Sequence, residues 1–405
     1  MISVWEKNSF LEHDTIIIGG GIVGLSTAAS LLEADPHHNI LILERGLIPT
    51  GASTKNAGFA CFGSVGEILS DIAIMGEKRT VDLVKMRYQG LQKLRKRVGD
   101  AGLDYQQHGG YEILTEEFMG NLSKVKYVND LLRPIFSEDV FSAVPEKIEE
   151  FGFSTKIVKS LIFNKFEGQI DSGKLMTNLA KYVQRLGAKI ITGALVKNYA
   201  KNSDGLMEVN VQNPLVAEGE ILKFVAKDVV VCTNAYSDTF LKGQNLFPAR
   251  GQVLITKPIQ GLKVQGTFFF DQGYVYFRNY NGRVLLGGAR NYDYQGEKTS
   301  EMKNTDVIMN RLEHILRDII LPGQNVEIER EWSGIMCFGE NEKSPIVGKI
   351  EPNVYAAVRM SGMGVAISSQ VAENIRDLIL SSRKEDLIGK STAVVEGRRI
   401  LTPRL

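Results

Sequence analysis

Six residues near the N-terminus constrain the fold more than any other part of the chain: Gly19-Gly20-Gly21-Ile22-Val23-Gly24. The apolar, β-branched run 15–18 before them is typical of a parallel strand that is buried on both faces. Residues 22–34 have the apolar periodicity of a helix that ends at Asp35-Pro36, and residues 39–43 form a second apolar run. This order predicts a strand–turn–helix–strand unit, the start of a Rossmann-type α/β sheet.

The glycine spacing matches G-x-G-x-x-G, and each glycine has a physical reason. Gly19 permits the tight turn, Gly21 lets the backbone approach a pyrophosphate, and Gly24 lets the helix pack on the strand. The pyrophosphate is expected on the free N–H groups at the helix N-terminus. Glu44, at the end of the second strand, can accept hydrogen bonds from ribose hydroxyls. The chain is therefore expected to bind a dinucleotide, although this pattern alone does not separate NAD from FAD.

The bulk properties exclude several classes of function. The net charge of +1 gives no electrostatic footprint for nucleic acid or an anionic membrane. Three cysteines that lie far apart (Cys61, Cys232 and Cys337) and five histidines show no metal-ligand spacing, and unpaired cysteines favour a cytoplasmic location. The uncharged stretch 15–32 reaches the length of a membrane span, but its glycines and the acidic residues before it argue against one.

A second glycine- and serine-rich segment, Gly51-Ala-Ser-Thr-Lys-Asn-Ala-Gly-Phe59, follows the second strand. Further short motifs follow in order at 170–175, 229–235, 248–252, 332–334, 345–348 and 361–364. With the fingerprint, this ordered set resembles the D-amino-acid oxidase superfamily of FAD-dependent enzymes, which includes glycine oxidase, monomeric sarcosine oxidase and gamma-glutamylputrescine oxidase. The resemblance covers nearly the whole chain. It implies FAD as the cofactor and oxidation of a small amine or amino acid by hydride transfer to the flavin.

The fingerprint and the resemblance together select the residues that are expected to hold FAD. They are Gly19, Gly21, Ile22, Val23, Gly24, Glu44, Arg45, Ala52, Ser53, Asn56, Ala57, Gly58, Val196, Gly334, Gly362, Met363, Gly364 and Val365. The 361–364 motif leads from a strand into a helix, so the free N–H groups of 362–365 are expected to face the pyrimidine end of the flavin. A positive helix terminus there stabilises the anionic reduced flavin, and an ordinary capped helix start is the alternative interpretation.

The substrate pocket is expected to be lined by Phe59, Tyr274, Tyr276 and Met336. Tyr274, Tyr276 and Arg278 alternate along one face of a predicted strand. The alternative for this face is an ordinary core surface with a solvated arginine. Hydride transfer to a flavin does not require an acid–base residue, so no catalytic base is assigned. A structural or exposed role is expected for His108.

A substrate carboxylate has no obvious partner in this sequence. Relatives that oxidise amino acids carry an arginine shortly after Trp-x-Gly that clamps the carboxylate, and Met336 stands at that place after Trp332-Ser-Gly334. This favours an amine or an N-substituted substrate. Four arginines could replace the clamp, and the sequence selects none of them: Arg250, Arg278, Arg290 and Arg359.

The pattern of elements changes character twice along the 405 residues. It is α/β at the start, with a helical region at 69–98 and another helix at 122–135. It becomes a series of short strands at 253–256, 267–270, 274–278 and 283–287, and ends with helices at 307–319 and 364–380 around a strand at 353–358. We therefore expect a Rossmann-type FAD-binding domain of residues 1–80, 152–245 and 328–405. An α+β substrate domain of residues 81–151 and 246–327, with a mainly antiparallel sheet, is inserted into it.

The electron acceptor is expected to be oxygen or a quinone. In sarcosine-oxidase-like relatives a lysine over the flavin promotes the reaction with oxygen, and its best match here is Leu285, which favours another acceptor. Arg283 would take that place if the strand register were shifted by two. FAD is expected to be non-covalent, although Cys337 lies near the place where monomeric sarcosine oxidase attaches its flavin. A nicotinamide-dependent dehydrogenase and a flavoprotein subunit that needs a partner remain as other interpretations.

Overall fold

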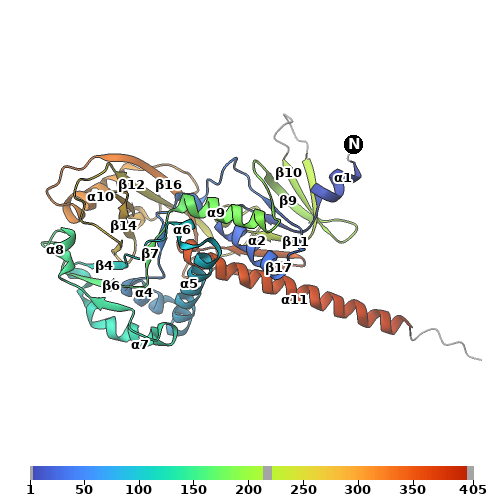
Figure 1. Ribbon diagram of the computed structural model, residues 1–405, viewed down its shortest axis with the longest axis horizontal. Coiled ribbons are helices and arrows are strands. Elements are labelled where there is room, and N and C mark those ends of the chain that lie inside the picture. Colours follow the sequence, from blue (N-terminus) through green and yellow to red (C-terminus); the bar gives the residue numbers. More distant parts are fainter. Residues whose placement is uncertain (1–2, 213–220, 399–405) are drawn as a thin grey trace, which may run out of the picture.

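The computed structural model describes residues 3–212 and 221–398, and for 385–398 it describes the helical backbone alone. Within these residues the strands form two eight-stranded sheets and a small two-stranded one. Figure 1 shows the two large sheets side by side along the long axis of the molecule. One sheet is mainly parallel with helices on it and the other is mainly antiparallel, which confirms the predicted α/β class with a second, sheet-based part.

The first sheet is built on five parallel strands, in the spatial order β18, β11, β1, β2 and β8. Their bounds are β1 Glu12–Ile18, β2 Ile40–Leu43, β8 Lys189–Ile191, β11 Ile221–Val231 and β18 Val354–Val358. Three antiparallel strands complete the sheet: β17 Ile346–Glu351 beside β18, β10 Met207–Gln212 beside β11, and β9 Leu195–Lys201 beside β10. The strands come from distant parts of the chain.

Successive side chains of these strands point to opposite faces of the sheet, and each face has its own core. One face packs against four helices: α2 Ile22–Ala34, α5 Glu77–Val98, α9 Ser172–Arg185 and α11 Gly364–Arg398. Helix α2 is buried over almost its whole length, which explains why its apolar residues surround the axis. The opposite face is covered by β9 and β10. Helix α11 runs past the edge of the sheet and extends away from the molecule (Figure 1).

The second sheet has the order β16, β12, β15, β14, β13, β4, β6, β5, and only the β13–β4 pair is parallel. Its bounds are β4 Gly110–Leu114, β5 Phe141–Ala143, β6 Ser160–Asn164, β12 Phe247–Thr256, β13 Thr267–Phe270, β14 Val275–Tyr280, β15 Arg283–Gly288 and β16 Ile328–Phe338. One face packs on α8 Lys147–Phe151 and α10 Asp306–Ile315, with Phe268 stacked on Phe277 at 4.7 Å. The other face turns Val253, Tyr276 and Leu285 toward the segment 57–59.

Several expected elements have different bounds. The helical region 69–98 is broken at Gly76, whose φ of 82° ends α4 Val65–Met75 before α5 begins. The helix expected at 122–135 begins later, since 116–124 form a 3-10 helix before α7 Val125–Phe136. Strands β6 and β16 are hydrogen-bonded into the second sheet, although the predicted ranges assign both to the FAD-binding domain. The domain boundaries stay a prediction. Residues 1–2, 213–220 and 399–405 of the predicted FAD-binding domain lie outside the described residues.

The sequence predicts that the uncharged stretch 15–32 does not span a membrane. In the described part of the chain no helix is both long enough and apolar enough to cross a bilayer. The stretch 15–32 is divided between the end of β1, the glycine turn and α2.

Candidate cofactor and substrate site

The three fingerprint glycines lie where a side chain has no room. Gly19 has a φ of 110°, and a Cβ there would lie 2.8 Å from the Cys232 carbonyl oxygen. A Cβ on Gly24 would overlap the Gly19 carbonyl oxygen, so this pair brings α2 against the end of β1. A Cβ on Gly21 would lie 3.0 Å from the Ser53 hydroxyl. The missing side chains therefore leave a narrow cradle between the turn and the 51–59 segment.

The N-terminus of α2 presents hydrogen-bond donors to this cradle. The Ile22 N–H donates to the Ser53 hydroxyl at 2.9 Å, and the Gly20 N–H donates to the Glu44 carboxylate at 2.9 Å. Within residues 3–212 and 221–398 the N–H groups of Val23 and Gly24 have no acceptor. Free donors at a helix N-terminus beside a carboxylate fit the diphosphate and the ribose of FAD.

The 51–59 segment folds around Asn56, which caps the short helix α3 Ala52–Lys55. The Asn56 amide donates to the Ser53 carbonyl at 2.8 Å, and its oxygen accepts from the Gly58 N–H at 2.9 Å and the Ser172 hydroxyl at 2.7 Å. Asn56 was expected to contact the cofactor. That contact stays a prediction, and the hydrogen bonds of its side chain shape the segment and join it to the start of α9.

Arg278 ties the same segment to the second sheet. Its guanidinium donates to the Ala57 carbonyl at 2.5 Å and the Ile170 carbonyl at 3.0 Å, and the residue is only 4% exposed. Burial lowers the pKa of Arg278 to about 10, since a charge is costly away from water. The interpretation of Arg278 as a solvated arginine is therefore wrong.

Three of the four expected pocket residues converge on one place. Phe59 and Tyr276 meet edge to face, with ring centroids 5.5 Å apart. A Cβ on Gly251 would lie 2.8 Å from Met336 Cε and 3.8 Å from the Tyr276 hydroxyl, so these side chains share the space above that glycine. Met336 Sδ also lies 3.9 Å from the position of a Cβ on Gly362. Met336 therefore brings this group of expected pocket residues next to the turn that leads into α11.

Tyr274, the fourth expected pocket residue, lies just before β14, where Arg290 stacks on its ring at 5.2 Å.

The backbone N–H groups at 362–365, before and at the start of α11, were expected to be free, and all but one of them are. The Met363 N–H donates to the Met360 carbonyl at 2.9 Å, so it is not available to a ligand. Within the described ranges the N–H groups of Gly362, Gly364 and Val365 have no acceptor. The Met363 sulfur contacts Cys61 Sγ at 3.9 Å, which places this turn beside the 61–67 segment.

Arg45, Val196 and Gly334, which were also expected to hold FAD, lie in three other parts of the fold. The Arg45 guanidinium lies over the Tyr236 ring at 3.7 Å, and Val196 is buried in the core of the first sheet. A Cβ on Gly334 would lie 2.9 Å from Lys55 Cβ, so β16 passes close to the 51–59 segment.

Cys337 points away from the pocket. It follows Met336 on β16, so its side chain lies on the opposite face of the strand, packed with Ala235 and Ile335. Burial raises the pKa of the Cys337 thiol to about 12, which keeps it protonated and unreactive. Both observations agree with non-covalent FAD.

Buried carboxylates support the 61–67 segment, and the sequence did not reveal them. Glu167 accepts from the Phe62 N–H at 3.0 Å, and Glu112 accepts from the Gly66 N–H at 3.0 Å. Burial raises the pKa of Glu167 to about 8 and that of Glu112 to about 7. An acidic residue in the printed sequence gives no local sign that it will be buried, because the partners of these two lie about 46 and 105 residues away.

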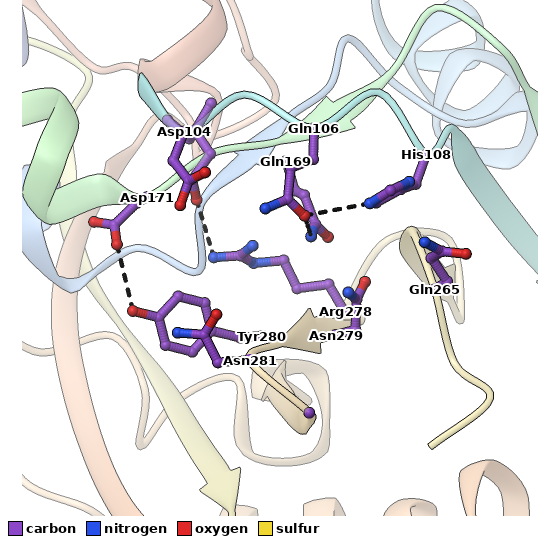
Figure 2. A pocket seen from close by; sticks show the side chains of 12 residues that line it. Asp104, Gln106, His108, Gln169, Asp171, Gln265, Arg278, Asn279, Tyr280 and Asn281 are labelled. Atoms are coloured by element: carbon purple, nitrogen blue, oxygen red, sulfur yellow. Dashed lines mark hydrogen bonds between the residues drawn. The ribbon is translucent and has the colours of Figure 1, made fainter. Parts of the chain in front are cut away.

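A polar cavity of about 260 Å³ is lined in part by Arg278, and none of the residues expected to bind FAD or to form the substrate pocket lines it. Figure 2 shows Tyr280 directed toward Asp171, and Gln106 between Gln169 and His108. The His108 ring is 3.2 Å from the Gln106 side-chain oxygen and is half-buried, in keeping with the structural role expected for it.

The family model described as DAO, FAD dependent oxidoreductase, matches residues 14–378, which is most of the chain. The protein belongs to the DAO family of FAD-dependent oxidoreductases. The nicotinamide alternative is therefore set aside, and FAD is the cofactor of this DAO-family protein.

Individual relatives are distant. The chain is 23% identical to "Probable oxidoreductase OrdL" of Haemophilus influenzae, over 96% of this chain and 89% of that protein. It is 21% identical to gamma-glutamylputrescine oxidoreductase of Escherichia coli, over 92% of this chain and 84% of that protein. The crystal structure of L-proline dehydrogenase from P. horikoshii superposes with a TM-score of 0.72 at 19% identity, over 92% of this chain and 94% of that one. At this identity the superposition establishes a shared fold.

Proposed function

We propose that this protein oxidises a carbon–nitrogen bond of a small amine or amino acid, with FAD as the acceptor of the hydride. The single observation that carries the proposal is the convergence of Phe59, Tyr276 and Met336 on the turn before α11. The name of the gamma-glutamylputrescine relative supports the choice of a carbon–nitrogen bond.

The chain's residues would bind FAD and orient the substrate. FAD, when bound, supplies a ring that accepts hydride. The free N–H groups of Val23 and Gly24 would hold its diphosphate, and those of Gly364 and Val365 would face the flavin. The apolar side chains of Phe59 and Met336 would exclude water and hold the substrate carbon in place.

Met336 also bears on the class of substrate. A thioether cannot make the bidentate, charge-assisted hydrogen bonds that a guanidinium makes with a carboxylate. A carboxylate at this position of the pocket would be unpaired, so we favour an amine or an N-substituted substrate over a simple α-amino acid. A cytoplasmic location remains part of the proposal, supported by three cysteines that are all unpaired and buried.

The test is anaerobic titration of the FAD-loaded protein with amines, D- and L-amino acids and N-methyl amino acids, followed by flavin absorbance. Bleaching by at least one compound that carries a C–H bond next to nitrogen is the expected result. Matched 2-hydroxy acids serve as controls, since they present the same carbon with oxygen in place of nitrogen. Bleaching by the hydroxy acids alone contradicts the proposal, and no bleaching by any compound favours a subunit whose activity needs a partner.

A further inference from the structure

The structure separates the four arginines that the sequence left equivalent. Arg250 is buried in an ion pair with Glu297, with 2.6 Å between the guanidinium and the carboxylate. Arg278 and Arg359 both donate to backbone carbonyl groups of neighbouring segments. These three guanidinium groups are already engaged in holding the fold, which leaves Arg290.

Arg290 is held by aromatic rings. Its guanidinium lies 4.2 Å from the ring centroid of Phe338, 5.2 Å from that of Tyr274 and 5.2 Å from that of Tyr294. Across the described residues the Arg290 guanidinium makes no hydrogen bond and no ion pair, and the residue is half-buried. The rings restrict the guanidinium but leave its N–H donors without acceptors.

The contacts of Phe338 place Arg290 beside the expected pocket residues. Phe338 lies two residues after Met336 on β16, on the same face, and its ring lies 4.0 Å from the position of a Cβ on Gly362. Burial raises the pKa of the Tyr276 phenol to about 12, and the Arg290 charge opposes this rise. The unpaired cation therefore lies against Phe338, which adjoins the turn before α11 together with Met336.

We propose that Arg290 binds a carboxylate of the substrate, so that the substrate is an amine with a carboxylate at some distance from the oxidised nitrogen. A guanidinium offers two parallel N–H donors that match a carboxylate, and the three rings hold it in place before binding. Arg290 thus determines specificity and does not take part in the hydride transfer. The assignment rests on the proposed function for the identity of the substrate as an amine.

The test measures binding without turnover. The FAD-loaded full-length protein is titrated with linear carboxylates of two to six carbons and with their amides, by flavin absorbance change and by calorimetry. The wild type should bind the best carboxylate more tightly than its amide. Arg290→Gln should weaken carboxylate binding about tenfold or more while changing amide binding less than about twofold. Arg290→Lys keeps the positive charge but loses the two parallel N–H donors of the guanidinium, so its carboxylate affinity should lie between those of the wild type and Arg290→Gln.

Arg283→Gln is the matched control. It makes the same change of net charge on β15, where Arg283 forms an ion pair with Glu329, and it should bind carboxylates as the wild type does. FAD content and melting temperature establish that each variant is folded. Carboxylate binding that is unchanged in Arg290→Gln, an equal loss for carboxylate and amide, or no carboxylate binding by the wild type would overturn the assignment. Failure of every amine to bleach the flavin would contradict the proposed function and leave this binding result interpretable.

Discussion

At the scale of single residues, the cofactor cradle depends on an absent side chain. A Cβ on Gly21 would already lie 3.0 Å from the Ser53 hydroxyl, so the two further methyl groups of valine would fill the space assigned to the diphosphate. We expect Gly21→Val to fold and to purify nearly free of FAD, measured as the flavin-to-protein absorbance ratio with circular dichroism as the folding check. Gly120→Val is the control, because no atom lies within 4 Å of a Cβ there. A Gly21→Val protein with full FAD occupancy would show that the cradle is elsewhere.

The same scale shows what the sequence could predict about the site. The glycines and Glu44 are recognisable because each acts within a short segment and its spacing carries the reason for it. Arg278 was not recognisable, since its acceptor at Ala57 lies 221 residues away and nothing local distinguishes it from a solvated arginine. Met363 was expected to offer a free N–H and does not, because a local turn to Met360 uses it.

At the scale of elements, the 61–67 segment has a stability that depends on pH. Burial raises the folded-state pKa of Glu167 to about 8 and that of Glu112 to about 7, against about 4.3 in an unfolded chain. The fold therefore favours their protonated forms. Their contribution is fully present below about pH 4.3, and it is lost as the pH rises toward 8.

We expect amide hydrogen exchange of residues 61–67, corrected for intrinsic rates, to become faster relative to the rest of the protein between pH 5.5 and 8.5. Glu167→Gln keeps an oxygen acceptor for the Phe62 N–H but cannot ionise, so it should remove much of this dependence. Strand β2 serves as the internal reference, because its residues are buried and uncharged. A dependence that is the same in Glu167→Gln and in the wild type would assign it to other groups.

The elements themselves were predictable to different degrees. Helix α2 has the predicted bounds because its apolar residues and flanking breakers act locally. Strand β16 was not predicted: its first half carries charged residues at 329–331, and it becomes a strand by pairing with β12 over ten positions. The second sheet as a whole combines β4 with β13, which lie more than 150 residues apart, and local patterns carry no information on such pairing.

At the scale of the whole molecule, the reduced flavin must pass its electrons to an acceptor, and two residues of β15 bear on which acceptor it prefers. Leu285 is 6% exposed and packs with Ala57 and Phe59, while Arg283 forms a surface ion pair with Glu329. Arg283 is thus engaged by Glu329, and Leu285 stays the predicted match to the lysine. We predict that Leu285 takes the place of the lysine that promotes oxygen reduction in sarcosine-oxidase-like relatives, so superoxide would form without the stabilisation of that charge.

We expect the reduced enzyme to prefer a quinone or an electron-transfer protein over oxygen. The measurement reduces the flavin anaerobically with a working substrate and compares its reoxidation in air-saturated buffer with turnover on an artificial quinone. Leu285→Lys should accelerate the reaction with oxygen about tenfold or more, and Leu285→Met, a neutral side chain of similar size, should not. Wild-type reoxidation by oxygen that is as fast as quinone turnover would identify an oxidase.

The order of strands in the first sheet has a consequence for folding during synthesis on the ribosome. β1 carries the glycine turn, yet its neighbour β11 and the next strand β18 leave the ribosome much later than β1 does. At about 5 to 20 residues per second, the interval between the turn and the start of α11 is roughly 20 to 70 s. Until β11 is synthesised, the edge of β1 that pairs with it has no partner, and until α11 begins, an early-arriving FAD lacks the free N–H donors at the start of that helix. We therefore expect nascent chains of this protein to expose an unpaired strand edge until β11 follows, which is the stage at which a chaperone would bind.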